Sequence, residues 1–486
     1  MKDKTYILLD KNEIKEKYSF VKNELDPYEV GFPLLDLSDE TICKIYYFRW
    51  HTFVKHIRKT PIGHVVTEFF PDVPWAGKYN TINCPASHHF YEGRWLYDYG
   101  YLESYARFWL SGEADVRKYS FPIVDAYYEF CKVKGDFSLC FELYDLLKEN
   151  YSKWEEEKKQ ENGLFYQRDG RDGMEYSISG HGLRPTINSY MYADSIALSK
   201  IAKMLGKADD EAYYMSKAEE LKRLIDENLW DSEACFYKNL SEDLGYKKAD
   251  VREEIGYVPW CYNIPDEDKG EAWKFLMDED YFAAPCGITS AERNHPRFME
   301  KFDHECLWNG PSWPFATSQT LTALANLLTN YGQNIMTKHD YFVLLKQYAN
   351  QHFITENGEK IPFIDEDLDP FTGEWIAKRE LEKMQDPPGG ADRGKDYNHS
   401  SFCDLVISGL CGIRTRADGF LEIDPLFCEN DLGWLCADGI KYRGHFISIL
   451  WDRDGEHYGL GKGFAVFVDG DKKATSDKIE KISIKL

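Results

Sequence analysis

Apolar residues recur at steps of three and four positions along most of the chain beyond about residue 97, which is the period of an amphipathic helix. One such stripe consists of Met215, Ala218, Leu221, Ile225 and Leu229. The same period runs through YLESYARFWL, SYMYADSIALSKIAKML, ATSQTLTALANLLTNY and HDYFVLLKQYANQHF. We therefore predict a mainly α protein in which helix follows helix.

Alternation of apolar and polar positions replaces this pattern after about residue 412. Phe464, Val466 and Val468 share one face of a predicted strand, and Asp-Gly turns bound this run and its neighbours. This pattern predicts a small C-terminal antiparallel β domain over residues 413–486. Residues 1–412 then form the main helical domain, although their first sixty residues mix the two periods.

Long loops rich in Gly, Pro, Asp and aromatic residues separate the predicted helices. Three of them are GRDGMEYSISGHGLRPTIN, ECLWNGPSWP and DPPGGADRGKDYN. Ordered loops of this length on a helical scaffold usually carry function. Trp and Tyr present flat apolar faces with one polar handle, which suit the CH-lined faces of sugar rings, and carboxylates and amides bind the hydroxyls. The loops therefore indicate a carbohydrate site.

The composition argues against several other functions. The 486 residues carry 59 Lys and Arg against 83 Asp and Glu, a net charge of −24, whereas a nucleic-acid binder needs a basic surface. No apolar run approaches the roughly 18 residues of a membrane span. The apolar stretch near the N-terminus is about four residues long, too short for a secretory leader. Signatures of phosphate loops, zinc proteases and serine hydrolases are also absent from the sequence.

The twelve cysteines are spread over the whole chain and form no C-x-x-C pair. This spacing favours neither a disulfide framework nor a zinc site. We therefore expect reduced, mostly buried thiols in a cytoplasmic protein.

Glycosidic cleavage needs two carboxyl groups with different roles. One donates a proton to the leaving oxygen, and the other acts as a base toward water or as a nucleophile. The acids within the loops are Asp172, Glu175, Asp365, Glu366 and Asp367. Because side chains alternate along the chain, the last three are not expected to point into one pocket together.

Four segments resemble blocks of the inverting glycosidase clan that folds as a six-hairpin (α/α)6 toroid, which includes processing α-glucosidases of the family 63 type, trehalases and mannosylglycerate hydrolase-like domains. GMEYS (173–177) is similar to the clan's G-M-D-N-S block, and DEDLDPFTGEW (365–375) to its Y-E-x-Y-D-P-x-T-G-E block. WNGPSWP (308–314) resembles W-R-G-P-V-W, and NHSSFCDLVISGL (398–410) resembles the segment that opens the last barrel helix. The resemblance implies the toroid fold, with a C-terminal β domain like that of related enzymes.

The resemblance also implies roles for the acids, with Glu175 as general acid and Glu366 as general base of an inverting hydrolase. Glu175 replaces the clan's usual Asp and Tyr176 its following Asn, so Asp172 stays as the alternative acid. Asn309 stands where the clan's tryptophan block has Arg.

Substrate-binding residues follow from the same blocks and from HHFYEGRWLYD (88–98) and LRPTINSYMYADSIAL (183–198). The resemblance implies this role for Glu92, Arg94, Trp95, Asn188, Tyr190, Trp308, Trp313 and His399. The chemistry that it implies requires no metal and no organic cofactor.

We thus expect a glycoside hydrolase that acts on an oligosaccharide or small glycoside, with no nucleic-acid or membrane partner. One alternative is a glycoside phosphorylase on the same fold, in which phosphate replaces the base. Another is a non-catalytic carbohydrate-binding protein. The acid in the D-P-x-T-G-E context argues against the phosphorylase, whereas the substitutions at positions 175 and 309 keep the binding protein open.

Overall fold

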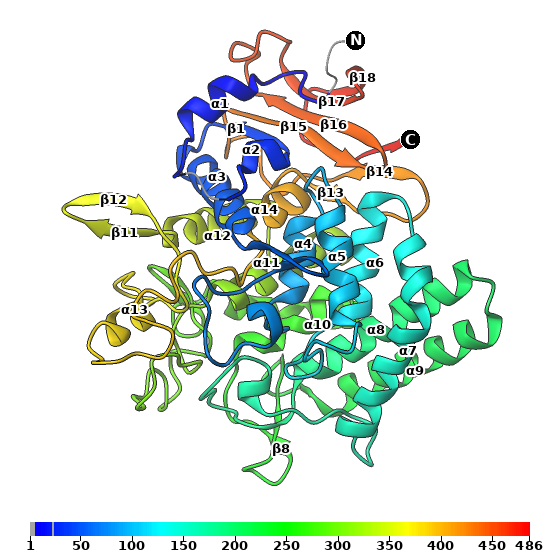
Figure 1. The fold of residues 1–486 in the computed structure, drawn as a ribbon, viewed down its shortest axis with the longest axis vertical. Coiled ribbons are helices and arrows are strands. Elements are labelled where there is room, and N and C mark those ends of the chain that lie inside the picture. The colour runs from blue at the N-terminus through cyan, green and yellow to red at the C-terminus, as the bar shows by residue number, and fades with distance from the viewer. Residues whose placement is uncertain (1–4, 22–23) are drawn as a thin grey trace.

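The computed structural model describes residues 5–21 and 24–486, so the first four residues of the N-terminal stretch considered for a leader lie outside it. Helices make up most of the regular structure, and several small antiparallel sheets accompany them. Figure 1 shows the helices in the body of the molecule and the largest sheet at one end, where the last residues of the chain also lie.

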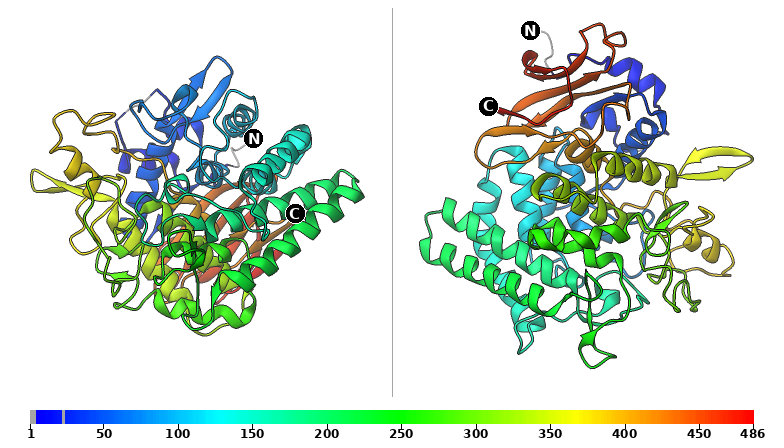
Figure 2. Two further views of the ribbon diagram at one scale, coloured as in Figure 1. Left: turned by 90° about the horizontal axis from the view of Figure 1, so that it is seen from below. Right: turned by 180° about the vertical axis from the view of Figure 1, so that it is seen from behind.

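Long helices form where the sequence has apolar stripes of helical period. Leu221 and Ile225 of the stripe described above are buried on α9 (Ala208–Asn228), which packs along α8 (Pro185–Met204) as an adjacent pair (Figure 2). The other helices of ten residues or more are α3 (Glu40–Lys55), α5 (Gly100–Trp109), α6 (Ile123–Lys134), α7 (Ser138–Lys158), α11 (Pro314–Asn330) and α12 (Lys338–Gln351).

Shorter helices connect these long ones. They are α1 (Lys11–Lys17), α2 (Pro27–Val30), α4 (Ala86–Gly93), α10 (Val258–Cys261), α13 (Ile376–Leu381) and α14 (Phe402–Asp404). α14 continues into a π-helical segment over residues 405–410, and the C-terminal run of strands follows from residue 413.

The largest sheet has five antiparallel strands in the order β1-β15-β16-β17-β18. They are β1 (Leu34–Leu37), β15 (Trp434–Tyr442), β16 (His445–Asp452), β17 (Gly463–Val468) and β18 (Asp471–Ser476). Leu34 of β1 pairs with Asp438 of β15, so a strand near the start of the chain completes a sheet whose other strands all follow residue 412.

Smaller sheets complete the strand structure. β13 (Ile413–Arg414), β14 (Phe420–Ile423) and β19 (Ile482–Lys485) form a three-stranded sheet. Hairpins are formed by β2 (Ile57–Thr60) with β3 (Gly63–Val66), and by β11 (Phe353–Glu356) with β12 (Glu359–Pro362). The remaining strands have two residues each: β4 (Gly182–Leu183), β5 (Trp230–Asp231), β6 (Phe236–Tyr237), β7 (Leu240–Ser241), β8 (Lys247–Lys248), β9 (Ala283–Ala284) and β10 (Gly287–Ile288).

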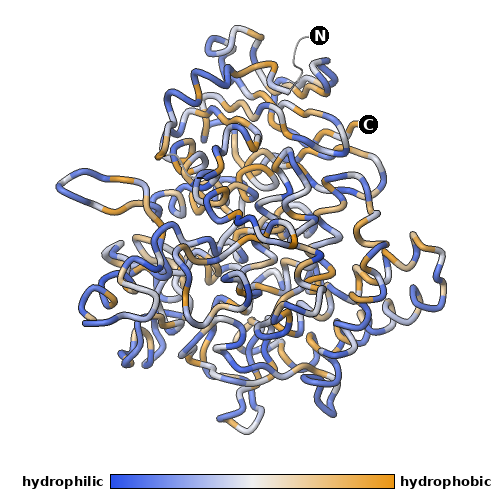
Figure 3. The backbone as a smooth tube through the Cα atoms, viewed as in Figure 1, coloured by the Kyte–Doolittle hydropathy of each residue, from blue (hydrophilic) through white to orange (hydrophobic). Residues whose placement is uncertain are grey.

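One continuous apolar core joins the helices to the large sheet. Figure 3 shows hydrophobic stretches along the helices and strands and hydrophilic ones at projecting turns, such as the tip of the β11–β12 hairpin. All twelve cysteines lie among the described residues and are free thiols, eight of them buried. Within the described ranges, no helix is both long enough and apolar enough to span a membrane.

Candidate active site

A cavity of about 320 Å³ opens between loops that come from distant parts of the chain. Among the residues that the structure describes, four glutamates line it: Glu68, Glu175, Glu305 and Glu366. Aromatic side chains contribute to its wall: Phe69, Trp75, Tyr119, Trp313 and Tyr397. Flat apolar faces beside several carboxyl groups are a combination that suits sugar rings.

Backbone hydrogen bonds tie the loops of Glu175 and Glu366 to one intervening segment. The amide of Trp308 donates to the carbonyl of Glu175 across 3.0 Å. Four residues later, Ser312 exchanges two hydrogen bonds of 2.9 Å with Leu368, which follows Glu366 by two positions. The tryptophan segment therefore fixes the two acidic loops relative to each other.

The carboxyl group of Glu175 has an unusual environment. Burial raises its pKa to about 7, and the negative charges of Asp169 and Glu366 act in the same direction. A hydrogen bond from its own backbone amide and the charge of Arg171 oppose this shift. A carboxyl with such a pKa holds its proton in a large fraction of molecules near neutral pH, as a general acid must.

Glu366 has a cation beside it. Nε of Arg393 lies 3.2 Å from Oε1 of Glu366, and another nitrogen of the same guanidinium binds Glu305. The thiol of Cys306 donates to Oε2 of Glu366. The side chains of Arg393 and Glu366 are each 4% exposed, so this charge pair is nearly removed from water. Glu175 and Glu366 thus differ in their electrostatic partners.

Glu68 is a further acid of the cavity. Its Oε1 accepts a hydrogen bond of 2.8 Å from the hydroxyl of Tyr397 and lies 3.4 Å from Nε2 of His399. Burial raises the pKa of Glu68 well above its usual value, and the charges of Glu366 and Glu175 add to this, although the Tyr397 hydrogen bond opposes it. Its second oxygen is buried without a hydrogen-bond partner among the described residues.

Asp172 does not line this cavity. Its Oδ2 accepts a hydrogen bond of 2.6 Å from Nε of Arg184 and another from the hydroxyl of Thr186. Its Oδ1 accepts one of 2.6 Å from the hydroxyl of Ser120. All of these side chains are buried. The carboxylate therefore fastens the Glu175 loop to the start of α8.

Glu92, Arg94 and Trp95 are also placed in the core. The carboxylate of Glu92 accepts hydrogen bonds of 3.0 and 2.8 Å from the backbone amides of Cys403 and Asp404, which belong to the first turn of α14. Arg94 and Trp95 both donate to the carboxylate of Asp404. These residues join α4 to α14, and none of them lines the cavity.

Asn188 and Tyr190 lie on α8 and are likewise buried away from the cavity. The side-chain amide of Asn188 bonds to the backbone N–H and C=O of Phe165 at 2.8 and 3.0 Å. The hydroxyl of Tyr190 accepts from the amide of Gln319 at 2.5 Å. Both contacts hold α8 against its neighbours.

Trp313 and His399 do line the cavity. Trp308 stacks on Trp313 with ring centroids 4.3 Å apart and planes inclined by 13°. The ring of His399 packs against Phe315 at 4.6 Å. Of the eight expected binding residues, these two therefore meet Glu175 and Glu366, and Trp308 supports one of them.

Sequence reasoning did not single out Glu68, Glu305, Cys306 or Arg393 as site residues. The last three lie in ECLWNGPSWP and DPPGGADRGKDYN, whose composition indicated function without showing which side chains face inward. Glu68 follows the β2–β3 hairpin and belongs to no motif that the sequence displayed.

His304, Glu305 and Cys306 bring potential metal-ligand atoms within 4.8 Å of one another. Each already has a partner: Nδ1 of His304 accepts from the Cys306 amide at 3.0 Å, Glu305 binds Arg393, and Cys306 donates to Glu366. These contacts hold the Glu366 side of the cavity together, and two-carboxyl chemistry does not call on a metal.

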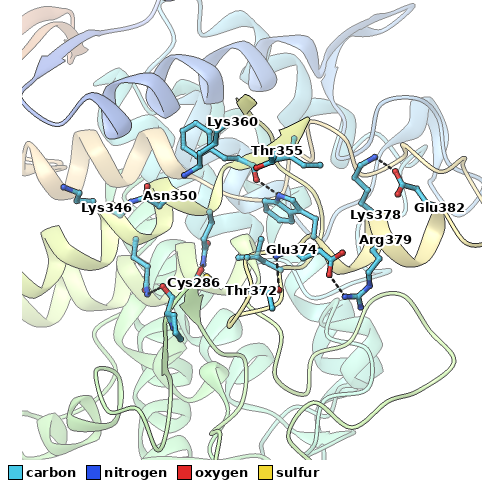
Figure 4. Close-up of a pocket in the computed structure, with 18 of the residues that line it drawn as sticks. Cys286, Lys346, Asn350, Thr355, Lys360, Thr372, Glu374, Lys378, Arg379 and Glu382 are labelled. Atoms are coloured by element: carbon cyan, nitrogen blue, oxygen red, sulfur yellow. Dashed lines mark hydrogen bonds and ion pairs between the residues drawn. The ribbon is translucent and has the colours of Figure 1, made fainter. Parts of the chain in front are cut away.

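A second hollow, of about 840 Å³, lies beside the 365–375 loop between α12, the β11–β12 hairpin and α13 (Figure 4). The acids that line it, Glu374 and Glu382, form ion pairs with Arg379 and Lys378. It therefore lacks two carboxyls in contrasting environments, which the smaller cavity has.

Residues 78–400 match the family described as the mannosylglycerate hydrolase MGH1-like glycoside hydrolase domain. Among curated proteins, an uncharacterized protein of Borreliella burgdorferi is 27% identical over 162 residues, which cover 31% of this chain and 32% of that protein. The chain thus matches about a third of the length of that relative.

Several solved structures are similar to this chain. A protein described as a sialidase has a TM-score of 0.91 and 36% identity over 99% of this chain, which spans less than half of that protein, 45%. The GH63 mannosylglycerate hydrolase from Thermus thermophilus in complex with glucose has a TM-score of 0.52 and 11% identity, covering 74% of this chain and 98% of that one. A GH78 rhamnosidase of Bacillus sp. GL1 has a TM-score of 0.52 and 13% identity, covering 86% and 40%.

The last two similarities concern the fold alone, because their sequence identities are low. The family match is stronger, because it extends over well over half of the chain and includes both Glu175 and Glu366. The chain therefore belongs to the MGH1-like glycoside hydrolase family.

Proposed function

We propose that the protein cleaves a glycosidic bond with inversion, with Glu175 as the general acid and Glu366 as the general base. The observation that carries this assignment is that both carboxyls line one cavity in contrasting environments. Burial and neighbouring acids raise the pKa of Glu175 to about 7, whereas Glu366 is paired with Arg393. Two carboxyl groups whose electrostatic environments differ in this way are typical of acid and base roles.

In this mechanism Glu175 gives its proton to the glycosidic oxygen as the bond from that oxygen to the anomeric carbon breaks. Glu366 removes a proton from a water molecule whose oxygen attacks the anomeric carbon from the opposite face. The products are a free sugar of inverted configuration and the protonated leaving group. Glu175 ends ionised and Glu366 protonated, so one proton exchange with solvent restores both.

In this proposal the cavity holds one sugar unit of the substrate. A volume of about 320 Å³ lies at the small end of ligand pockets, which favours a terminal unit over a continuous stretch of polysaccharide. Trp75 and Trp313 provide apolar faces for the ring, and Glu68 and His399 provide polar groups for its hydroxyls. We infer exo-action on an oligosaccharide or small glycoside.

The proposed architecture is an (α/α)6 toroid over residues 1–412 with a C-terminal β domain over residues 413–486. The fold similarity to the GH63 hydrolase supports the toroid, and the run of strands from β13 onward supports the boundary, across which β1 adds one strand to the C-terminal sheet. Limited proteolysis tests the boundary: we expect early cuts within residues 412–420. The free thiols support our proposal of a cytoplasmic location, which fractionation of cells producing the tagged protein can check.

The test is sugar release from a panel of glycosides by the wild type, Glu366→Gln and Glu175→Gln. The panel includes sialosides, a mannosylglycerate and rhamnosides, because the structural neighbours carry those names. Each substitution removes the ionisable group with little change of shape, so we expect a loss of at least about a hundredfold in kcat. Glu374→Gln is the matched control, because Glu374 lies on the same loop as Glu366 but lines the second hollow and not the cavity. Equal activity in all the variants contradicts the assignment.

Two further measurements separate the alternatives. Proton NMR of the first product formed shows whether the anomeric configuration inverts. Cleavage that requires inorganic phosphate would favour a phosphorylase, which the clustering of four glutamates around one already paired arginine disfavours. Sugar binding without turnover of any substrate would favour a non-catalytic binding protein.

A further inference from the structure

Tyr176 directly follows Glu175 and is an exposed aromatic residue at the site. Its side chain is 42% exposed, and its backbone has φ of +60°, in the left-handed region that non-glycine residues rarely adopt. For an L-residue this conformation costs about 1–2 kcal/mol. A costly conformation beside a reacting group points to a functional requirement for this side chain.

The ring of Tyr176 belongs to a small aromatic cluster. Its centroid lies 5.0 Å from that of Phe302, with the planes inclined by 31°, and 5.2 Å from that of His304. These separations are those of favourable aromatic contacts. The exposed tyrosine is therefore supported by two neighbours and offers a firm surface.

This cluster adjoins the cavity. His304 lines the cavity together with Glu175, and the hydrogen bond from the Trp308 amide to the Glu175 carbonyl ties the two loops that build the cluster. Tyr176 itself does not line the cavity. The aromatic surface thus begins at the rim of the cavity, where the loop of the general acid meets the segment of Phe302 and His304.

The geometry of the reaction indicates which part of the substrate lies next to the general acid. The general acid gives its proton to the leaving-group oxygen, so the atoms attached to that oxygen lie beyond the acid and outside the pocket of the cleaved sugar. We propose that Tyr176, supported by Phe302 and His304, forms a leaving-group subsite that stacks on a second sugar ring. The inference rests on the proposed function and assigns its substrate as a glycoside whose leaving group is itself a sugar.

The sequence adds an independent reason to connect this ring with specificity. Tyr176 stands where the clan's resembling block has Asn, a residue that tolerates the left-handed region far better. Asn suits the backbone but lacks an aromatic face. The chain therefore has an aromatic residue at this position although the left-handed backbone conformation there is unfavourable for it.

The test compares Tyr176→Asn with the wild type on two substrates that share one glycosyl unit, a methyl glycoside and a disaccharide. Asn fits the backbone, so the variant is expected to fold. We expect KM for the disaccharide to rise about tenfold, which is the effect of about 1.4 kcal/mol of lost stacking, and KM for the methyl glycoside to stay within about twofold. Tyr176→Phe keeps the ring and should restore the wild-type KM.

Tyr246→Asn is the matched control. Tyr246 has φ of +61° and is 46% exposed, values close to those of Tyr176, but it lies in the turn of residues 242–246, where no ring contact among the described residues joins it to a cavity-lining side chain such as His304. Its replacement should therefore leave both substrates unaffected. A second readout is inhibition by the free leaving-group sugar, which Tyr176→Asn should weaken by the same factor.

The outcomes separate the two proposals. If the wild type turns over neither substrate nor any member of the panel, the proposed function fails and the subsite fails with it. If the wild type cleaves both substrates and Tyr176→Asn changes them equally, the function stands and the leaving-group subsite is refuted.

Discussion

Arg393 and Glu366 form a buried ion pair in the cavity, with Nε of the guanidinium 3.2 Å from Oε1 of the carboxylate. The same guanidinium binds Glu305, so one cation serves two carboxylates. Removing one member of a buried pair leaves uncompensated charge, at a cost of about 3–5 kcal/mol. We expect Arg393→Met to lower the free energy of unfolding in urea by about this amount.

The effect of Arg393→Met should depend on pH. Burial alone would raise the pKa of Glu305, but the hydrogen bond and charge of Arg393 outweigh it and lower the pKa. A lowered carboxyl pKa stabilises the fold above the unfolded value of about 4.3, and this contribution is lost as the pH falls through the folded value. The full loss of unfolding free energy in Arg393→Met is thus expected at pH 7, and a smaller loss below about pH 4.

Arg379→Met is the control for this prediction. It breaks a half-exposed pair with Glu374 and should cost at most about 1 kcal/mol of unfolding free energy. An equal loss in both variants would contradict the prediction.

The raised pKa of Glu175 predicts the alkaline limit of activity. The general acid works only while protonated, and burial raises the pKa of this carboxyl to about 7. We expect kcat/KM to fall tenfold per pH unit well above pH 7, as measured in initial rates between pH 4 and 10. A rate that stays level to pH 9 would mean that another group donates the proton.

Stability provides a check on the same carboxyl that does not need a substrate. A carboxyl whose pKa is raised on folding stabilises the fold below its unfolded pKa and loses that contribution as the pH rises through the folded value. Glu175→Gln should therefore match the wild type at pH 4 and exceed it at pH 8.5, by at most about 3 kcal/mol. Urea unfolding at the two pH values measures the difference in unfolding free energy between Glu175→Gln and the wild type. If this difference is the same at both pH values, burial of the charged carboxyl is not its cause.

Local features of the fold could be predicted from the sequence, because they depend on neighbouring residues. The apolar stripe through Leu221 and Ile225 forms the buried face of α9, and the alternation at Phe464 and Val466 forms β17. The pairing of β1 with β15 was not predicted, because the register that places Leu34 opposite Asp438 joins segments some four hundred residues apart. No local pattern specifies such a partner.

The candidate site likewise has some features that the sequence predicts and others that it does not. Resemblance of short blocks identified the loops that bring Glu175 and Glu366 to one cavity. It did not show which way a side chain faces: Arg94 lies in the HHFYEGRWLYD segment (88–98), for which the resemblance implied a binding role, yet it binds Asp404 in the core. Glu68 enters the cavity from a segment without any recognisable motif, so only the folded chain reveals it.

Asp172→Asn separates a structural acid from a catalytic one. The carboxylate of Asp172 binds the guanidinium of Arg184 at 2.6 Å, and both side chains are almost fully buried. Its replacement leaves the arginine without its counter-charge, so we expect a loss of about 3–5 kcal/mol in unfolding free energy. Because Asp172 does not line the cavity, it affects kcat only through the position of the Glu175 loop, so kcat of the folded fraction should fall by less than the roughly hundredfold expected for Glu175→Gln. A variant that is stable but inactive would instead make Asp172 the proton donor.

Gly173 precedes Glu175 by two positions and sets the path of the loop. It has φ of +72°, and a Cβ added there would lie 2.5 Å from Sγ of Cys84. Gly173→Ala should therefore cost about 1–2 kcal/mol for the left-handed backbone and more for the clash. The clash also displaces the loop, so we expect kcat to fall at least about tenfold, because small errors in the position of a catalytic group reduce rates strongly.

The two costs at Gly173 can be measured apart. Gly206 has a similar φ of +69° with no atom within 4 Å of an added Cβ, so Gly206→Ala reports the backbone cost alone. In Cys84→Ala/Gly173→Ala the nearest of these contacts lengthens to the 3.9 Å of the residue 84 Cβ, which removes the clash and keeps the backbone cost. We expect the double variant to recover both stability and kcat relative to Gly173→Ala, after correction for Cys84→Ala alone in a double-mutant cycle. If Gly173→Ala costs no more than Gly206→Ala and the cycle shows no coupling, contact with Cys84 does not position the loop of the general acid.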